Sequence, residues 1–443
     1  MVSTRGTSRS TLWGNRDFVK LWAGQTVSLA GSQVTTLALP LTAVLLLRAT
    51  PVQTGLLYAA QFAPFLVLTL FAGVLVDRMR RRPILIAADL GRALLLGLIP
   101  LFAWLGWLRF THLVIVAFLA GCLTVFFHLA YQAFLPTLLG RDHLTEGNGH
   151  LAASESAAEI GGPGLGGVLV QLLSAPFALG ADALSFLVSA LSLASLRTCE
   201  SLPQRRDDRR LLADIRAGFR VTFGSPYLRA LLGEAAIFNF FENGMLTVFV
   251  VYAIRTLHLS PLVYGAIFVV GSAGGLLGAV LTGAAARRFG VGRTMVAAAA
   301  LSSIAVVPIP LAGGPPALTV AVLAFSFFLR GAGVTGTNVH AVSLRQALTP
   351  DHLLGRMNAS YRTISYGAIP LGALTGDALG QLLGLRPALF VLAGGIFFTW
   401  LWLRFSPIFA LRELPSQPTV PAILAAAAPE PAPVPERAEP LAV

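Results

Sequence analysis

The sequence predicts an all-α polytopic membrane protein in which twelve transmembrane helices form two pseudo-symmetric six-helix halves. The mean hydropathy is +0.74, and only 12% of the residues are charged, far below the roughly 25% of a soluble domain. Apolar runs recur at the length that a bilayer requires, because a helix needs ~20 mostly apolar residues to cross ~30 Å of hydrocarbon. One long connection, 197–226, separates the sixth run from the seventh.

Candidate spans follow one another along the chain, each separated from the next by Arg, Pro or Gly. The first run is longer than the apolar core of a cleaved signal peptide, so we expect it to remain as a span. The spans are 18–47, 52–76, 84–107, 111–138, 148–173, 176–196, 227–254, 262–285, 294–313, 316–344, 358–382 and 387–409. They define a cytoplasmic N-terminal segment 1–17, a six-helix bundle 18–196, a central loop 197–226, a second six-helix bundle 227–410 and a disordered Ala/Pro-rich tail 411–443.

Arginine supplies almost all of the basic residues behind the formal net charge of +12. In a soluble chain this balance would suggest nucleic-acid binding, but in a polytopic chain Lys and Arg mark the cytoplasmic loops. One side has only Arg48, Arg109, Arg255 and Arg386. The other side has Arg5, Arg9, Arg16, Arg78, Arg80, Arg81, Arg82, Arg141, Arg287, Arg288, Arg293, Arg356 and the run 205–220. We therefore expect a plasma-membrane protein with both termini in the cytoplasm and no nucleic-acid partner.

The central loop contains a helical pattern of apolar residues, Leu211, Ile215, Phe219 and Phe223, with arginines elsewhere around the helix. This pattern predicts a short amphipathic helix on the anionic inner leaflet; the alternative is a helix that docks a partner. Cys122 lies in an apolar run and Cys199 beside a basic loop, so no disulfide is expected.

A charged loop separates the second and third spans and carries Gly73, Asp77, Arg78, Arg81 and Arg82. With a degraded copy from Gly283 to Arg293 in the second half, it resembles the loop signature of the major facilitator superfamily, although Val76 and Arg80 depart from the usual pattern. The resemblance implies that Gly73, Asp77, Arg78 and Arg81 form a conformational latch on the cytoplasmic side. In the alternative interpretation the arginines merely follow the positive-inside rule.

The fifth span carries Gly162, Pro163, Gly166 and Gly167, which resemble the signature of exporters in this superfamily. Small residues allow close helix approach in lipid, and proline bends a helix. The resemblance implies a flexing seam between the halves and favours export. We expect the seam to be completed by the eighth span; the alternative is ordinary tight packing. The expected partners on the eighth span are Gly271, Gly274, Gly275 and Gly278.

Two acids, Glu155 and Glu159, precede this motif and share its helical stripe. A carboxylate inside a membrane is costly, and desolvation next to a like charge favours binding a proton. Both residues are therefore candidates for proton coupling. The alternative is that Glu155 lies near the cytoplasmic end and is simply hydrated.

By resemblance, the first, fourth, seventh and tenth spans line a central substrate cavity. Arg330 lies mid-span and demands an acidic partner, for which Glu242 and Glu234 are the candidates. Asp89 and Arg92 lie three residues apart, which predicts a structural ion pair across one helical turn. Asp182 lies near the start of the sixth span, where a carboxylate is expected to cap the helix. The predicted cavity residues are Gln25, Ser32, Tyr131, Asn239, Glu242 and Arg330, with aromatic lining from Phe238, Phe241, Phe249, Phe325, Phe327 and Phe328.

Asn15-Arg16-Asp17-Phe18 and Gly355-Arg356-Met357-Asn358 resemble the superfamily branch of macrolide effluxers and siderophore exporters. The expected function is secondary active export of a bulky amphipathic molecule, by proton antiport and alternating access. The alternatives are a nutrient uptake permease and a non-transporting receptor on the same fold. No phosphate-binding loop or enzyme-like constellation occurs, so no enzyme activity, cofactor or metal is expected. The expected partners are the substrate, protons and the lipid bilayer, and the expected state is a monomer.

Overall fold

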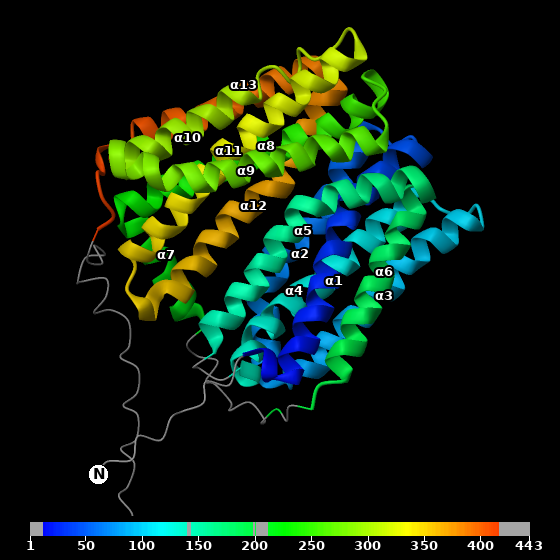
Figure 1. Ribbon diagram of the computed structural model, residues 1–443, viewed down its shortest axis with the longest axis horizontal. Helices are drawn as coiled ribbons and strands as arrows, with labels where there is room; N and C mark the ends of the chain where they lie inside the picture. The colour runs from blue at the N-terminus through cyan, green and yellow to red at the C-terminus, as the bar shows by residue number, and fades with distance from the viewer. Residues whose placement is uncertain (1–11, 140–142, 198–199, 201–210, 416–443) are drawn as a thin grey trace, which may run out of the picture.

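The computed structural model describes residues 12–139, 143–197, 200 and 211–415. Within these ranges the chain consists of helices joined by short connections (Figure 1). The helices are α1 Arg16–Leu41, α2 Pro51–Arg78, α3 Arg81–Trp104, α4 Phe110–Leu139, α5 Leu144–Leu173, α6 Ala175–Ala194, α7 Leu211–Gly224, α8 Pro226–Val251, α9 Pro261–Phe289, α10 Val291–Ala305, α11 Pro316–Leu348, α12 Asp351–Leu383 and α13 Leu385–Arg404, with short η elements at Leu12–Gly14, Thr42–Leu46, Tyr252–Thr256 and Pro407–Ala410.

Nine of the described helices are long and apolar enough to cross a membrane. α10 is shorter than the predicted ninth span because its regular helix ends at Ala305, and the chain continues in turns that contain Pro308 and Pro310. α5 and α12 are continuous and long enough to span a membrane, but the charged side chains along them make them less apolar than the nine. The all-α membrane fold is therefore confirmed, whereas the count of twelve spans stays a prediction.

The helices pack as two bundles, α1–α6 and α8–α13, which appear as the lower and upper halves of Figure 1. The end at which α1 begins and α13 ends is called the terminal side here, and the opposite end the far side. Because successive long helices run in opposite directions, α2 and α9 begin at the far side and end at the terminal side. The two bundles meet through α2 with α12 and through α5 with α9.

Both halves contain the same irregular segment at the far side. α1 continues into a wide turn at Thr42–Leu46, and α8 continues into the same kind of turn at Tyr252–Thr256. Each turn is followed by a non-glycine residue in the left-handed region, Arg48 with φ 51° and His258 with φ 52°. The repeat of so unusual a backbone conformation indicates that the halves are structurally related copies.

α7 is docked on the second half, which the sequence analysis did not predict. Gly218 lies against the carbonyl of Arg356 and the hydroxyl of Ser360 on α12, and Val221 is buried in the adjoining core. Phe223 is exposed, so contact of that face with lipid remains a prediction. The side chains of Leu211 and Ile215 lie outside the described parts of the chain, as do the arginines before Leu211 and the tail from 416 onward.

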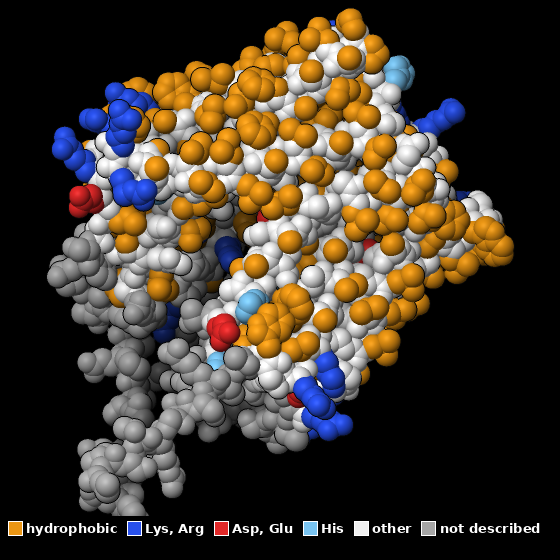
Figure 2. Space-filling model, in the orientation of Figure 1, with side chains coloured by type: hydrophobic (Ala, Val, Ile, Leu, Met, Phe, Trp, Pro, Cys, Tyr) orange, Lys and Arg blue, Asp and Glu red, His pale blue; other side chains and the backbone are white. Residues whose placement is uncertain are grey.

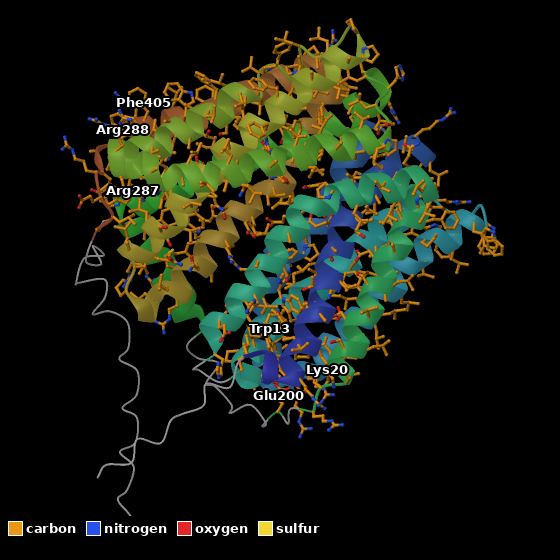
Figure 3. All side chains as sticks on the ribbon, viewed as in Figure 1. Trp13, Lys20, Glu200, Arg287, Arg288 and Phe405 are labelled. Atoms are coloured by element: carbon orange, nitrogen blue, oxygen red, sulfur yellow. The ribbon has the colours of Figure 1, made fainter. Side chains whose placement is uncertain are left out.

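The charged loop after α2 is held within the first half. The Glu200 carboxylate accepts hydrogen bonds from the backbone amides of Arg81 at 2.8 Å and Arg82 at 3.2 Å, and so caps the start of α3. Arg82 donates to the carbonyl of Leu193 at 2.9 Å, at the end of α6. Figure 3 shows Glu200 and Lys20 together at this end of the bundle.

The corresponding loop of the second half, between α9 and α10, holds the segment that follows the last helix. The amides of Val291 and Gly292 donate to the carbonyls of Arg412 and Leu411 at 3.0 and 2.9 Å. Figure 3 shows Arg287 and Arg288 at this end of the second half, near Phe405. The two copies of the loop therefore secure different parts of the chain.

Replacing Glu200 by alanine removes both amide acceptors and the Arg81 ion pair at 3.4 Å. We expect a loss of roughly 1–2 kcal/mol of stability, the value of a helix N-cap, visible as a lower thermal unfolding midpoint in detergent. Glu413→Ala, at an exposed acid, is the matched control. Equal midpoints for the two variants would contradict the capping role.

Candidate functional site

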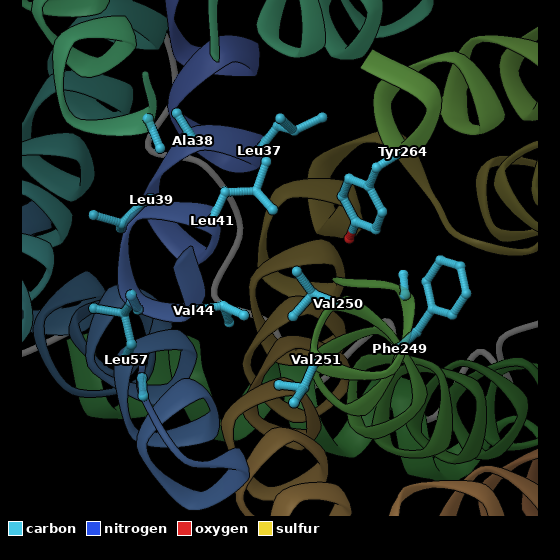
Figure 4. Packing of buried hydrophobic residues seen from close by; sticks show 14 of the residues in the cluster. Leu37, Ala38, Leu39, Leu41, Val44, Leu57, Phe249, Val250, Val251 and Tyr264 are labelled. Carbon is cyan, nitrogen blue, oxygen red and sulfur yellow. The ribbon is translucent and has the colours of Figure 1, made fainter. Parts of the chain in front are cut away.

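The apolar core is continuous between the halves only on the far side. One cluster joins α1 and α2 to α8 and α9, and Figure 4 shows its members Leu37 and Leu41 of α1 facing Val250 and Tyr264 of the second half. Toward the terminal side the described core divides into one cluster in each half. The far side is therefore closed, and the halves separate toward the terminal side.

Glycines allow the halves to approach closely at two crossings. Gly167 of α5 lies against Gly265 of α9, and the Pro163 carbonyl lies over the same glycine. At the second crossing, Gly55 of α2 lies against Asp377 and Ala373 of α12. A side chain at any of these glycines would push the helices apart.

Part of the predicted seam lies elsewhere. Gly162 packs against Gln33, and Gly166 against Val34, both on α1 of the same half. The eighth-span glycines, Gly271, Gly274, Gly275 and Gly278, face α11 of their own half rather than the first half. Of the predicted seam residues, Pro163 and Gly167 contact the other half: both lie against Gly265, and Gly167 also lies against Pro261 and Leu262, none of which the sequence analysis had named.

A cavity of ≈ 90 Å³ lies between the halves on the closed side. Ligand pockets commonly measure about 300–1,000 Å³, so this space suits water rather than a bulky molecule. Toward the terminal side, Figure 2 shows a hollow between the halves, with basic side chains inside it. The residues that line the small cavity are Gln33, Thr36, Leu37, Pro40, Thr54, Tyr58, Pro163, Leu246, Thr247, Val250, Tyr264 and Phe268.

The structure pairs Arg330 of α11 with Glu242 of α8, one of the two predicted partners. The side chains are 17% and 5% exposed. Glu242 also lies within electrostatic range of Tyr58 across the interface between the halves. One atom of each partner, Arg330 Nε and Glu242 Oε2, has no hydrogen-bond partner among the described residues. The pair therefore retains polar capacity for a ligand or water.

None of the other predicted cavity residues lines the cavity of ≈ 90 Å³. Gln25 points into its own half and donates to Ser189 at 2.9 Å, so it is not a cavity residue. Asn239 donates to the carbonyl of Ser365 at 2.8 Å and ties α8 to α12. Ser32 is half-buried on α1, and Tyr131 stacks on Phe127 at 5.8 Å between ring centroids.

Glu155 and Glu159 both have exposed side chains, on a helix that packs against α1 of its own half and α9 of the other half. Glu155 is within electrostatic range of the Tyr131 phenol, and Glu159 is within range of Glu155. The backbone carbonyl of Glu159 accepts from Ser272 of the second half at 3.3 Å. The two acids therefore lie close enough to influence each other's charge, beside the interface between the halves. Further along the same face of α5, Gly162 and Gly166 pack against α1.

The proposed latch is described only in part. α2 continues through Asp77 to Arg78, whereas the side chain of Asp77 lies outside the described parts of the structure. Arg78 is exposed, and Arg81 pairs with Glu200 of the same half. The geometry thus assigns Arg81 a bond within its half, and the latch role of Gly73 and Asp77 stays a prediction.

The aromatic lining differs from the prediction. Phe249 and Phe327 are fully buried in the core of the second half, and Phe325 is 63% exposed on the outer surface of α11. Phe241 packs over Gly395 of α13. The aromatic residues of the second half that line the cavity of ≈ 90 Å³ are Tyr264 and Phe268, neither of which was predicted.

Two buried acids have roles that the sequence analysis missed. Asp182 is not a helix cap: it lies inside α6 and accepts hydrogen bonds from Thr35 at 2.5 Å and Ser185 at 2.8 Å. Asp377 of α12 is fully buried at the crossing with α2. The signal that could have identified Asp377 was a carboxylate in an apolar span, which marks a functional candidate by default.

Sequence comparison relates this chain to transporters. The family described as Major Facilitator Superfamily matches residues 21–373 and 232–436. The multidrug efflux pump Tap of Mycolicibacterium fortuitum is 28% identical over 415 residues, which cover 90% of this chain and 97% of that protein. Macrolide efflux protein A of Streptococcus pyogenes is 26% identical over 231 residues, covering 50% of this chain and 55% of that protein.

Solved structures show the same fold. The inward-facing crystal structure of a bacterial homologue of the iron transporter ferroportin has a TM-score of 0.71 at 18% identity, covering 88% of this chain and 98% of that chain. The nucleoside transporter NupG has a TM-score of 0.68 at 12% identity, covering 88% and 98%. The cargoes of these two proteins differ, so the likeness concerns the fold alone.

The Glu242–Arg330 pair generates a double-mutant prediction. Glu242→Gln leaves the arginine unpaired, and we expect a loss of about 3 kcal/mol of stability, the lower end for breaking a buried pair because Arg330 is 17% exposed. Adding Arg330→Met removes the stranded charge, so the double variant should recover part of the loss in thermal unfolding. If the effects of the two substitutions simply add, the pair is not coupled.

Proposed function

This chain belongs to the Major Facilitator Superfamily, and we propose that it exports bulky amphipathic small molecules by proton antiport and alternating access. It is a membrane transporter and not an enzyme. The observation that carries the export proposal is the similarity to a named multidrug efflux pump, which extends over 90% of this chain. The partial match to a macrolide efflux protein supports the same substrate class.

Alternating access is supported by the distribution of the apolar core. One cluster joins the halves at the far side, while two separate clusters hold the halves at the terminal side. Two rigid bundles with a dry closure on one side can rock about the central cavity, and access then changes side. The glycine contact between Gly167 and Gly265 gives the closure its tight packing.

We propose that the terminal side faces the cytoplasm. Figure 2 displays basic side chains at the terminal ends of both halves, and the positive-inside rule assigns such ends to the cytoplasm. With this orientation the structure is the inward-open state, in which substrate enters the hollow between the halves from the cytoplasm.

Proton coupling is assigned to Glu155 and Glu159. Exposed carboxylates on a membrane helix face water or protein, and the hollow open to the terminal side supplies that water. In the inward-open state the two acids release protons to the cytoplasm, and the resulting negative charge attracts a lipophilic cation. In the outward-open state they take up protons from outside, which weakens binding and releases the substrate.

The proposed substrate class, an amphipathic molecule, rests on a site that offers few polar groups among apolar side chains. The Glu242–Arg330 pair keeps one polar atom on each partner without a hydrogen bond among the described residues, and the Phe327 ring lies 5.6 Å from the Arg330 guanidinium group. Such a site orients an amphipathic molecule through one or two polar contacts, whereas a sugar requires many. An uptake permease would accumulate label in whole cells, and a receptor would bind ligand without flux.

Glu155→Gln combined with Glu159→Gln removes both titrating groups and keeps their size. We expect this double variant to lose substrate uptake driven by a pH gradient into everted membrane vesicles, because neither of the two carboxylates assigned to proton exchange remains. Uptake is followed with radiolabelled macrolide or a fluorescent lipophilic cation. Each single variant separates the contribution of one acid from the other.

Glu146→Gln is the matched control, because Glu146 is an exposed acid in the first turn of the same helix. It should transport like the parent protein. The amount of protein in the membrane and its thermal unfolding midpoint exclude a folding defect. Full pH-driven uptake by the Glu155/Glu159 double variant would remove both acids from the mechanism.

A further inference from the structure

Asp377 lies at the contact between the two halves on the closed far side. Its side chain has no exposed surface, and its carboxyl group covers Gly55 of α2, from the other half. Gly55 has no side chain, and this absence gives the carboxyl group its room. Opening the far side therefore separates Asp377 from the surface that buries it.

None of the ion pairs among the described residues includes this carboxyl group. Neither oxygen has a hydrogen-bond partner among the described residues. The threonines beside it, Thr54 of α2 and Thr247 of α8, donate their hydroxyl hydrogens to the carbonyls of Pro51 at 2.6 Å and Gly244 at 3.0 Å. A protonated carboxyl group can donate to either hydroxyl oxygen, whereas an ionised one can accept a hydrogen bond only if a threonine hydroxyl turns away from its carbonyl partner.

The charged and titratable groups on the neighbouring helices are engaged elsewhere. Glu242 of α8 pairs with Arg330, and Tyr58 of α2 lies within range of Glu242. Arg386 of α13 donates to Tyr252 and Ala312, at 2.9 and 3.0 Å. Arg255, after α8, donates to the carbonyl of Ala49 at 2.7 Å. α7 packs on α12 near Arg356, at the opposite end of that helix.

A route for the proton is present. Thr54 and Thr247 line the cavity of ≈ 90 Å³ between the halves, a volume that holds several water molecules. Asp377 is close enough to both threonines to interact with their hydroxyl groups. A proton that reaches the cavity water can therefore reach the carboxyl group through a short polar path.

We propose that Asp377 is a proton-binding site that locks the far side shut: the closed state holds the acid dry and neutral, and opening hydrates and ionises it. The inference rests on the proposed function only for the existence of a state in which the far side opens. The closed state then binds one proton more than the open state, so low pH favours closure and high pH favours opening. A single proton changes the ratio of the two states by at most about tenfold per pH unit.

The test measures the distance between the halves directly. Spin labels are placed at Trp107→Cys and Leu311→Cys, far-side positions 66% and 65% exposed in the two halves, after replacing Cys122 and Cys199 by serine in the full chain. Double electron–electron resonance distances are recorded in lipid nanodiscs from about pH 5 to pH 9. The parent protein should gain a longer-distance, open population as the pH rises.

Asp377→Asn mimics the neutral acid, and its closed population should no longer depend on pH. Asp182→Asn, at a buried acid bonded entirely within the first half, should keep the parental pH dependence. If the asparagine variant cannot be purified, Asp377→Glu serves instead and should shift the pH midpoint. Unaltered pH dependence in Asp377→Asn, an unshifted midpoint in Asp377→Glu, or a pH-independent parent overturns the proposal. The readout needs no substrate and no gradient, so a negative transport assay refutes the proposed function and leaves this result standing.

Discussion

The apolar contact between the two halves on the far side is the interaction on which the rest of the structure depends. One apolar cluster joins α1 and α2 to α8 and α9, and Gly167, Gly265 and Gly55 bring the backbones close enough for that cluster to be continuous. Because this contact closes the far side, the hollow that opens at the terminal side does not pass through the molecule. The small cavity lies between the halves, and the Glu242–Arg330 pair joins α8 to α11 within the second half. A transporter needs such a closure to be tight and also reversible, and small residues with an uncompensated acid suit both requirements.

Most of the fold could be predicted because the bilayer imposes a length and a hydropathy on every spanning helix. The runs at 111–138 and 316–344 fall within a few residues of α4 and α11. The predicted ninth span extends beyond the end of α10, since the helix stops before Pro308 and Pro310 in a stretch whose hydropathy is apolar. The docking of α7 on α12 could not be predicted, because its amphipathic pattern fits a protein surface and a lipid surface equally well.

The site was harder to predict, because a helical stripe shows which residues share a face but not which neighbour that face meets. Gln25 and Gly162 belong to plausible stripes, yet packing turns Gln25 toward α6 and Gly162 toward α1. The aromatic residues met the same difficulty, since Phe249 and Phe327 fill the core of the second half. The pairing of Arg330 with Glu242 could be predicted from the sequence, because an arginine in the middle of a span requires an acidic partner and the spans contain few acids. Asp377 carried the same kind of signal and was overlooked.

The central claim is that export of an amphipathic substrate is coupled to protons. The most direct measurement follows a pH-sensitive dye in everted vesicles with an inward proton gradient, while macrolides, lipophilic cations and siderophores are added one at a time. The account predicts that at least one compound dissipates the gradient in vesicles that contain the transporter and has no effect in vesicles that lack it. If ligand binding is detected and no compound moves protons, the account is contradicted, and the uptake or receptor alternatives take its place.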